Sequence, residues 1–270
     1  MPDTTADGGS LPRPIRIAAQ LQPQHGDYTE IRAAAARAEE MGVDVVFNWD
    51  HFFPLSGDPT GKHFECWTML ASFAEVTERV EIGALVTANS YRNPDLLADM
   101  ARTVDHISAG RLILGIGAGW FPHDYDEYGY DFGTPGTRLS SLEQALPRIE
   151  RRWEKLNPSP TRKIPILIGG GGERKTLRYT ARHADIWHGF GQPDVIRHKN
   201  QVLDDWCLQE GRSPEEIERS CGANPLKPET GDRYVEAGAT LITLSFDGRT
   251  GWDLAPLKEW IAWRDLGNHG

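Results

Sequence analysis

The chain has 270 residues, of which 39% are hydrophobic and 25% are charged, a composition typical of a globular protein. Asp and Glu total 39 and Lys and Arg total 29, so the formal net charge of -10 disfavours nucleic acid and anionic membranes as partners. The three cysteines lie far apart and form no C-x-x-C pair, so we expect free thiols in a reducing, cytoplasmic compartment.

Residues 1–14 differ in composition from the rest of the chain. They are rich in Asp, Thr, Gly, Ser and Pro and contain no apolar stretch, which predicts a flexible N-terminal tail rather than a signal peptide. No run approaches the roughly 18 apolar residues of a membrane-spanning helix. Residues 15–270 have about the length of one α/β barrel, for which roughly 250 residues are typical, so we expect a single domain there.

From residue 15 onward, short apolar runs alternate with longer amphipathic segments. Strands are predicted at 15–21, 43–49, 81–87, 111–119, 164–169, 184–190, 218–223 and 240–246. Helices are predicted at 28–41, 64–77, 93–108, 137–156, 173–183, 194–210, 230–237 and 254–264. Eight such units with continuously apolar strands favour an α/β fold of the (β/α)8 TIM-barrel type. An open, doubly wound sheet is the alternative.

Asp50 and His51 follow the second predicted strand in the run N-W-D-H-F-F, residues 48–53. In a barrel the active site lies at the carboxyl ends of the strands, and an imidazole held by a carboxylate is suited to proton transfer. The alternative is structural, with His51 donating to a backbone carbonyl and Asp50 capping a turn. The position after a strand favours the catalytic interpretation.

Four consecutive glycines, Gly169, Gly170, Gly171 and Gly172, end the fifth predicted strand and precede a helix. Backbone N–H groups in such a run can approach an anion, and the helix N-terminus adds a favourable dipole. The run therefore predicts a phosphate-binding loop, with a tight turn between strand and helix as the alternative.

A second run of small residues, G-I-G-A-G-W at 115–120, ends the fourth strand. It lacks the spacing of a dinucleotide fingerprint, and we expect its small residues to let a flat ring lie against the strand ends. The aromatic and acidic segment 121–132 is predicted to be a loop, partly lining a substrate pocket and mostly solvated. Trp49 and Trp120 at strand ends, and His188 near the end of the sixth strand, are further candidates for that pocket. No metal site is expected, because the histidines show no H-x-H or H-E-x-x-H spacing.

Several motifs in order together resemble one family. They are N-W-D-H-F at 48–52, I-G-A-L-V-T at 82–87, S-Y-R-N-P at 90–94, D-H-I-S-A-G-R-L at 105–112 and G-I-G-A-G-W at 115–120. The chain resembles the luciferase-like superfamily, and more narrowly its F420-dependent oxidoreductases of actinobacteria. The resemblance implies a (β/α)8 barrel, usually a homodimer, that binds a deazaflavin or flavin at the strand ends.

The resemblance also implies roles for individual residues. The cofactor phosphate would lie on the backbone after Gly169–Gly172, and Asp50 and His51 would lie beside the deazaflavin. A non-prolyl cis peptide would fall near Leu85-Val86. The cofactor ring would lie near three residues of the third and fourth strand ends: Val86, Thr87 and Ala118.

Two features depart from the family pattern. The connection at 157–163, before the fifth strand, is shorter than in many relatives, so we expect a site with less cover. Ala118 stands where some family dehydrogenases place an acid, which disfavours a sugar-phosphate dehydrogenase and leaves His51 as the expected proton-transfer residue.

The function that the resemblance implies is hydride transfer between F420 and a small organic substrate. An FMN-dependent luciferase-like monooxygenase and a non-catalytic flavin- or deazaflavin-binding protein are the alternatives.

Overall fold

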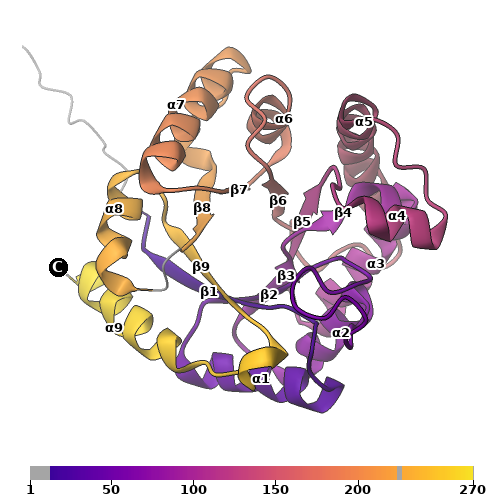
Figure 1. Ribbon diagram of the computed structural model, residues 1–270. Coiled ribbons are helices and arrows are strands. Elements are labelled where there is room, and N and C mark those ends of the chain that lie inside the picture. The colour runs from indigo at the N-terminus through magenta and orange to yellow at the C-terminus, as the bar shows by residue number, and fades with distance from the viewer. Residues whose placement is uncertain (1–12, 224–226, 270) are drawn as a thin grey trace, which may run out of the picture.

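The computed structural model describes residues 13–223 and 227–269, which form one closed barrel of parallel strands surrounded by helices (Figure 1). The strands are β1 (Arg16–Leu21), β2 (Val45–Asn48), β3 (Glu81–Ala84), β4 (Thr87–Ala88), β5 (Leu112–Gly117), β6 (Ile166–Gly169), β7 (Ile186–Gly189), β8 (Glu218–Gly222) and β9 (Leu241–Phe246). The helices are α1 (Tyr28–Met41), α2 (Cys66–Val76), α3 (Pro94–Ile107), α4 (Pro122–Tyr128), α5 (Pro135–Trp153), α6 (Thr176–His183), α7 (Pro193–Gln209), α8 (Gly231–Glu236) and α9 (Ala255–His269).

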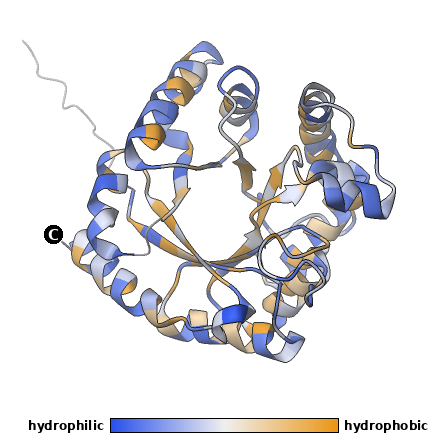
Figure 2. Ribbon diagram, viewed as in Figure 1, coloured by the Kyte–Doolittle hydropathy of each residue, from blue (hydrophilic) through white to orange (hydrophobic). Residues whose placement is uncertain are grey.

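The sheet closes because β5 pairs with both halves of the third predicted strand. The order of strands is β3-β2-β1-β9-β8-β7-β6-β5-β4, and β3 also pairs with β5. Gly83 of β3 pairs with Ile113, and Thr87 of β4 pairs with Ile116 further along the same strand. Counting β3 and β4 as one interrupted strand, the predicted (β/α)8 TIM barrel is confirmed, and Figure 2 shows its strands as predominantly hydrophobic.

The interior of the barrel is filled at its amino end. Arg16 there bridges Glu81 at 2.7 Å and Glu218 at 2.6 Å. These carboxylates raise the pKa of Arg16 even though burial opposes its charge. An apolar cluster lies above them, formed by Ala18, Val45, Phe47, Leu85, Ile113, Leu167, Ile186 and Leu241. The carboxyl ends of the strands are therefore left to form a site.

Val86 lies between β3 and β4, and its peptide bond with Leu85 is cis, at the place that the resemblance implied. A Cβ atom at Gly117 would lie 2.8 Å from a Val86 methyl carbon, and one at Gly115 would collide with the Ala84 carbonyl oxygen. Gly115 and Gly117 of β5 thus leave room for the backbone of Ala84 and the side chain of Val86. The expectation that the small residues at 115–120 let a flat ring lie against the strand ends stays a prediction.

Segment 121–132 is the main difference from the predicted elements, because it contains helix α4 rather than only a loop. Pro122 occupies the first turn and Gly129 ends the helix with φ at 68°. Both are local helix signals, in the arrangement of an N-terminal proline and a C-terminal glycine. The weakest predicted strand, 218–223, is present as β8.

The short connection at 157–163 lies at the opposite end of the barrel from His51. Arg162 donates to Glu81 at 2.8 Å and to the Leu112 carbonyl at 3.2 Å, and these two residues begin β3 and β5. The expectation that shortening here reduces the cover of the site is therefore wrong, because helix-to-strand connections lie at the amino ends of barrel strands. Most of the predicted tail, residues 1–12, lies outside the described residues.

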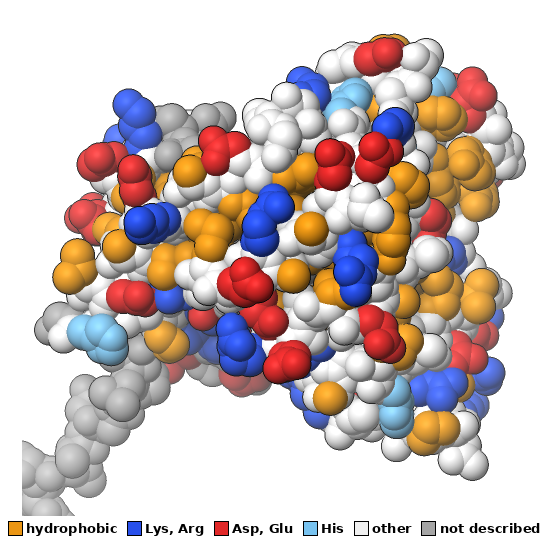
Figure 3. Space-filling view, turned by 90° about the horizontal axis from the view of Figure 1, so that it is seen from below, with side chains coloured by type: hydrophobic (Ala, Val, Ile, Leu, Met, Phe, Trp, Pro, Cys, Tyr) orange, Lys and Arg blue, Asp and Glu red, His pale blue; other side chains and the backbone are white. Residues whose placement is uncertain are grey.

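Acidic and basic side chains are interspersed on the face formed by α9, α1 and α2 (Figure 3). No single-sign stripe crosses this face. Among residues 13–223 and 227–269, no helix combines the length and the apolar character that crossing a membrane requires.

Candidate active site

The predicted site residues all lie in or just after the carboxyl-terminal parts of barrel strands. The residues and their positions are Trp49, Asp50 and His51 after β2, Val86 and Thr87 at β4, Ala118 and Trp120 after β5, Gly169–Gly172 at the end of β6, and His188 in β7. The barrel therefore places on one face residues that are distant in the sequence.

His51 is held by a carboxylate, and that carboxylate is Asp124 of α4. The Nδ1 atom of His51 lies 2.7 Å from Asp124 Oδ2. The imidazole is partly accessible, with 12% of its side chain exposed, whereas the Asp124 side chain is fully buried. This is the carboxylate–imidazole arrangement that suits proton transfer, assembled from residues 73 positions apart.

Asp124 is satisfied by three donors. The Phe52 N–H donates to Oδ1 at 3.1 Å, and the Tyr91 hydroxyl donates to Oδ2 at 2.8 Å. Burial alone would raise the pKa of Asp124, but the hydrogen bonds from His51, Phe52 and Tyr91 lower it below its ordinary value of 3.8. Asp124 is therefore an ionised acceptor at neutral pH.

Asp50 forms a separate buried ion pair. Arg92 donates to both of its oxygens, at 2.6 and 3.0 Å, and the Ala88 N–H of β4 donates at 3.0 Å. Arg92 also donates to Glu65, which caps the N-terminus of α2. Burial raises the pKa of Asp50, while Arg92 and Ala88 counter that rise. Asp50 thus holds β4 and the start of α2 in place.

The two candidate tryptophans lie on either side of His51. Its ring centre is 5.6 Å from that of Trp49 and 5.8 Å from that of Trp120, both edge to face. Trp49 is buried and donates its indole N–H to His63 at 3.0 Å, whereas Trp120 is 62% exposed. The structure therefore brings two other predicted site residues, Trp49 and Trp120, against the His51 imidazole.

The glycine run is shaped by β7. The Gly170 N–H donates to the His188 carbonyl at 3.1 Å, and the Trp187 indole donates to the Gly170 carbonyl at 2.8 Å. Gly170 has φ at 127°, a region that favours glycine. Gly169 packs on Val86, where a Cβ atom would lie 3.0 Å from a methyl carbon. The run thus joins the Val86 segment to the start of α6.

His188 is buried in the barrel with its neighbours on β7 and β8. Its Nδ1 atom lies 2.9 Å from the Ser220 hydroxyl, and its ring packs edge to face on Phe190. Burial lowers the pKa of His188 to about 4, so the imidazole is neutral at physiological pH. Its contacts differ from those of His51, so a substrate-pocket role for His188 stays a prediction.

Three functional candidates were missed by reasoning from the sequence: Tyr91, Arg92 and Asp124. Asp124 belongs to the segment that was predicted to be a loop, partly lining a substrate pocket and mostly solvated, and it was given no role beside His51. Recognising α4 from Pro122 and Gly129 would have placed Asp124 in the first turn of a helix, but not against His51. Among the described residues, no group of three or more His, Cys, Asp or Glu side chains is arranged to hold a metal ion.

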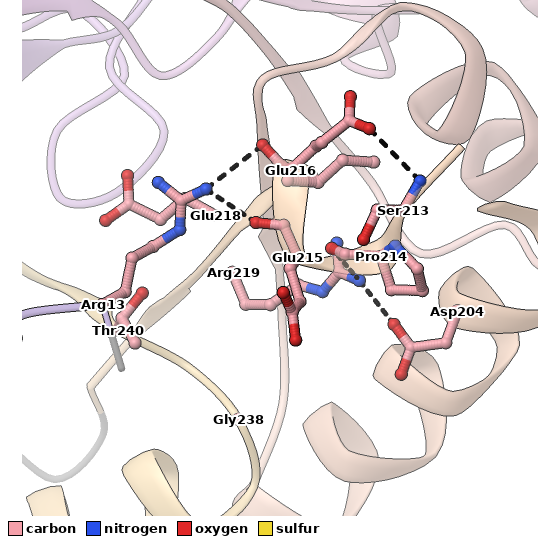
Figure 4. Close-up of a pocket in the computed structure, with 11 residues that line it drawn as sticks. Arg13, Asp204, Ser213, Pro214, Glu215, Glu216, Glu218, Arg219, Gly238 and Thr240 are labelled. Atoms are coloured by element: carbon pink, nitrogen blue, oxygen red, sulfur yellow. Dashed lines mark hydrogen bonds and ion pairs between the residues drawn. The ribbon is translucent and has the colours of Figure 1, made fainter. Parts of the chain in front are cut away.

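A hollow of about 640 Å³ lies at the amino ends of the strands, far from these residues (Figure 4). Two of its arginines already have hydrogen-bond partners within the chain. Arg13 donates to the carbonyls of Glu215 and Glu216, and Arg219 pairs with Asp204 at 2.5 Å. These fixed contacts indicate a structural role for this end of the barrel.

A family model described as luciferase-like monooxygenase matches residues 13–244. The chain belongs to the luciferase-like monooxygenase family. It is 25% identical over 282 aligned residues to an uncharacterized protein of Mycobacterium tuberculosis. That alignment covers 96% of this chain and 95% of that protein. It is also 29% identical over 170 residues to the F420-dependent glucose-6-phosphate dehydrogenase of Amycolatopsis mediterranei, a match that spans 56% of this chain and half of that enzyme.

Two solved structures illustrate the range of this fold. An F420-dependent secondary alcohol dehydrogenase in complex with an F420-acetone adduct superposes with a TM-score of 0.80 at 16% identity, covering 91% of this chain and 98% of that one. The FMN-bound oxygenating component of 3,6-diketocamphane monooxygenase from Pseudomonas putida superposes with a TM-score of 0.63 at 15% identity. This match covers 76% of the present chain and 66% of the monooxygenase chain. At these identities the likeness shows the fold.

Proposed function

We propose that this protein is an F420-dependent oxidoreductase that transfers a hydride between the deazaflavin and a small organic substrate. The observation that carries the proposal is the His51 imidazole, held by Asp124 at the carboxyl ends of the strands and flanked by Trp49 and Trp120. Relatives named as F420-dependent support the choice of cofactor.

The residues after β6 fit an anionic cofactor. Gly171 lies beside Lys199, because a Cβ there would lie 3.7 Å from Lys199 Cε, an ordinary van der Waals contact. The run leads into the N-terminus of α6, where backbone N–H groups and the helix dipole favour a phosphate. Gly171 and Gly172 would offer backbone N–H groups to the phosphate, since the Gly170 N–H is already donated to the His188 carbonyl. Lys199, which bonds Glu173 at 2.6 Å, would add a positive charge beside them. Val86, Thr87 and Ala118 would contact the ring.

The cofactor, when bound, supplies the hydride chemistry. The protein's own residues handle the proton. The His51 imidazole, held by Asp124, accepts a proton from a substrate hydroxyl or returns one to a carbonyl oxygen. Trp49 and Trp120 limit the access of water to the imidazole.

An FMN-dependent monooxygenase is the second candidate, favoured by the FMN-bound structural neighbour. Titration of the purified protein with F420 and with FMN, followed by fluorescence, separates the two. We expect F420 to bind at least about tenfold more tightly. Tight binding of FMN, together with oxygen consumption by the reduced complex, would instead establish the monooxygenase.

Replacing His51 tests its role in proton transfer. We expect His51→Ala to lower kcat by about 100-fold or more, the usual contribution of a positioned acid–base group, with little change in cofactor affinity. His106→Ala is the matched control, because the His106 side chain is exposed on α3 and bonds the Ser159 carbonyl. Wild-type kcat in His51→Ala would refute the role. Binding of F420 without turnover of any substrate would point to a non-catalytic protein.

A further inference from the structure

The carboxylate that holds His51 is carried by α4, which lies outside the barrel wall. Asp124 Oδ2 faces the His51 Nδ1 at 2.7 Å and also accepts from the Tyr91 hydroxyl at 2.8 Å. Oδ1 accepts from the Phe52 N–H at 3.1 Å. All three partners follow β2 or β4, so the fully buried Asp124 is the contribution of α4 to this cluster.

We propose that Asp124 is the positioning residue of His51, keeping the hydrogen on Nδ1 so that Nε2 exchanges the proton with the substrate. This inference rests on the function proposed above. An ionised carboxylate only accepts hydrogen bonds, so the imidazole donates to it from Nδ1. Because Asp124 belongs to α4, His51 gains this partner only when α4 is docked on the strand ends.

The docked position of α4 is held by aromatic side chains. The Tyr125 hydroxyl lies 2.8 Å from the Ser90 hydroxyl, and the Tyr125 ring is fully buried. The ring of Tyr128 stacks on Phe52, with 4.0 Å between the ring centres. These contacts hold the part of α4 that follows Asp124, so the carboxylate is presented to His51 in one orientation.

Other titratable groups face the pair from each neighbouring segment. They are His63 before α2, Tyr91 in the turn before α3, Tyr125 of α4, and Asp50, which is bound to Arg92. Burial lowers the pKa of His63 to about 4 and raises that of both tyrosines, so these three groups are neutral at pH 7. Asp124 is therefore the anion in direct contact with the imidazole.

The tautomer of the neutral His51 ring in the cofactor-free protein tests this role without reference to activity. Nitrogen-15 NMR of the imidazole shows which ring nitrogen carries the hydrogen, and we expect Nδ1 in the wild type. Asp124→Asn can present an amide N–H to Nδ1 and should move the hydrogen to Nε2. Tyr91→Phe removes one donor but keeps the carboxylate, and should leave the hydrogen on Nδ1. Asp126→Asn, on the exposed side of α4, should also leave it there.

The contrast between Asp124→Asn and Tyr91→Phe makes the test specific, since general loosening of the fold would change the tautomer in both variants. Such a common change, or an unchanged tautomer in Asp124→Asn, would overturn the proposal.

Steady-state turnover separates this inference from the proposed function. Asp124→Asn should lower kcat by about 10- to 100-fold with nearly unchanged cofactor affinity, and Tyr91→Phe should retain more activity because the carboxylate is still present. Wild-type turnover in Asp124→Asn together with a loss in His51→Ala would overturn the positioning role and leave the proposed function standing. Wild-type turnover in His51→Ala would overturn both.

Discussion

Asp50 and Arg92 form an ion pair of which both members are almost completely enclosed. The Asp50 side chain is fully buried and that of Arg92 is 11% exposed, with two hydrogen bonds between them. The Ala88 N–H adds a third bond to the carboxylate. Removing one member of a buried pair leaves the other charge without compensation, which is costly even where the intact pair is close to neutral for stability.

We therefore expect Asp50→Ala to lower the free energy of unfolding by about 3–5 kcal/mol, measured by urea denaturation at pH 7. Asp95→Ala is the matched control, because Asp95 pairs with Arg148 at the surface and that pair is screened by solvent. The control should cause a much smaller loss. Equal losses in the two variants would show that the burial of Asp50 is unimportant.

At the scale of elements, Glu39 joins α1 to the turn before β3. Its carboxylate accepts from the backbone N–H groups of Glu78, Arg79 and Val80, at 2.6 to 3.1 Å. Burial opposes the charge, but these three N–H donors lower the pKa of Glu39 below its ordinary value of 4.5. The ionised carboxylate therefore stabilises the connection between helix and strand.

Because the folded pKa of Glu39 is lowered, its contribution is complete above pH 4.5 and is lost as the pH falls through the folded value. Glu39→Gln should lower the free energy of unfolding by about 2 kcal/mol at pH 7, the range for hydrogen bonds to a charged group. The difference from wild type should shrink near pH 3. The exposed neighbour Glu40 supplies the control, Glu40→Gln. A pH-independent difference would contradict the ionised role.

The α3–β5 turn shows that a motif carrying the family resemblance can be structural. Arg111 donates to the carbonyls of Ala74, Thr77 and Val80, and so ties the end of α2 to β5. Asp105 accepts from Thr161 on the short connection before β6. The motif at 105–112 therefore specifies the fold, while the residues after β2 form the site.

For the whole molecule, the family resemblance implies a homodimer, and we propose the α2–α3 face as its interface. A hollow of about 600 Å³ there is lined by Trp67 and Met100, with Leu96 54% and Ile107 38% exposed beside it. Asp99 and Arg102 pair on the same face, so two copies related by a twofold axis can exchange these opposite charges.

Leu96→Glu should convert the dimer to a monomer, measured by size-exclusion chromatography with light scattering. A charge at a buried interface position lacks a partner and is costly to desolvate. Leu208→Glu is the control, because Leu208 is 68% exposed on α7, away from this face. A wild-type protein that is monomeric at micromolar concentration, or a dimer that survives Leu96→Glu, would contradict the assignment.

Local patterns in the sequence determined the barrel. Helix α1 begins and ends at the predicted residues because Asp27 and Glu30 form a capping box and Gly42 adopts φ of 100° at its end. Asn93 and Pro94 likewise begin α3. These signals act within a few residues, so they can be read without the fold.

Only the tertiary structure shows which carboxylate is hydrogen-bonded to His51. Asp50 is adjacent to His51 in the sequence, yet it bonds Arg92, 42 residues away, while Asp124 reaches the imidazole from 73 residues away. The sequence determined that an aspartate–histidine pair would lie at the strand ends of a barrel. The docking of α4 and the enclosure of Arg92 decided the partners, because long-range contacts depend on how loops pack and not on local spacing.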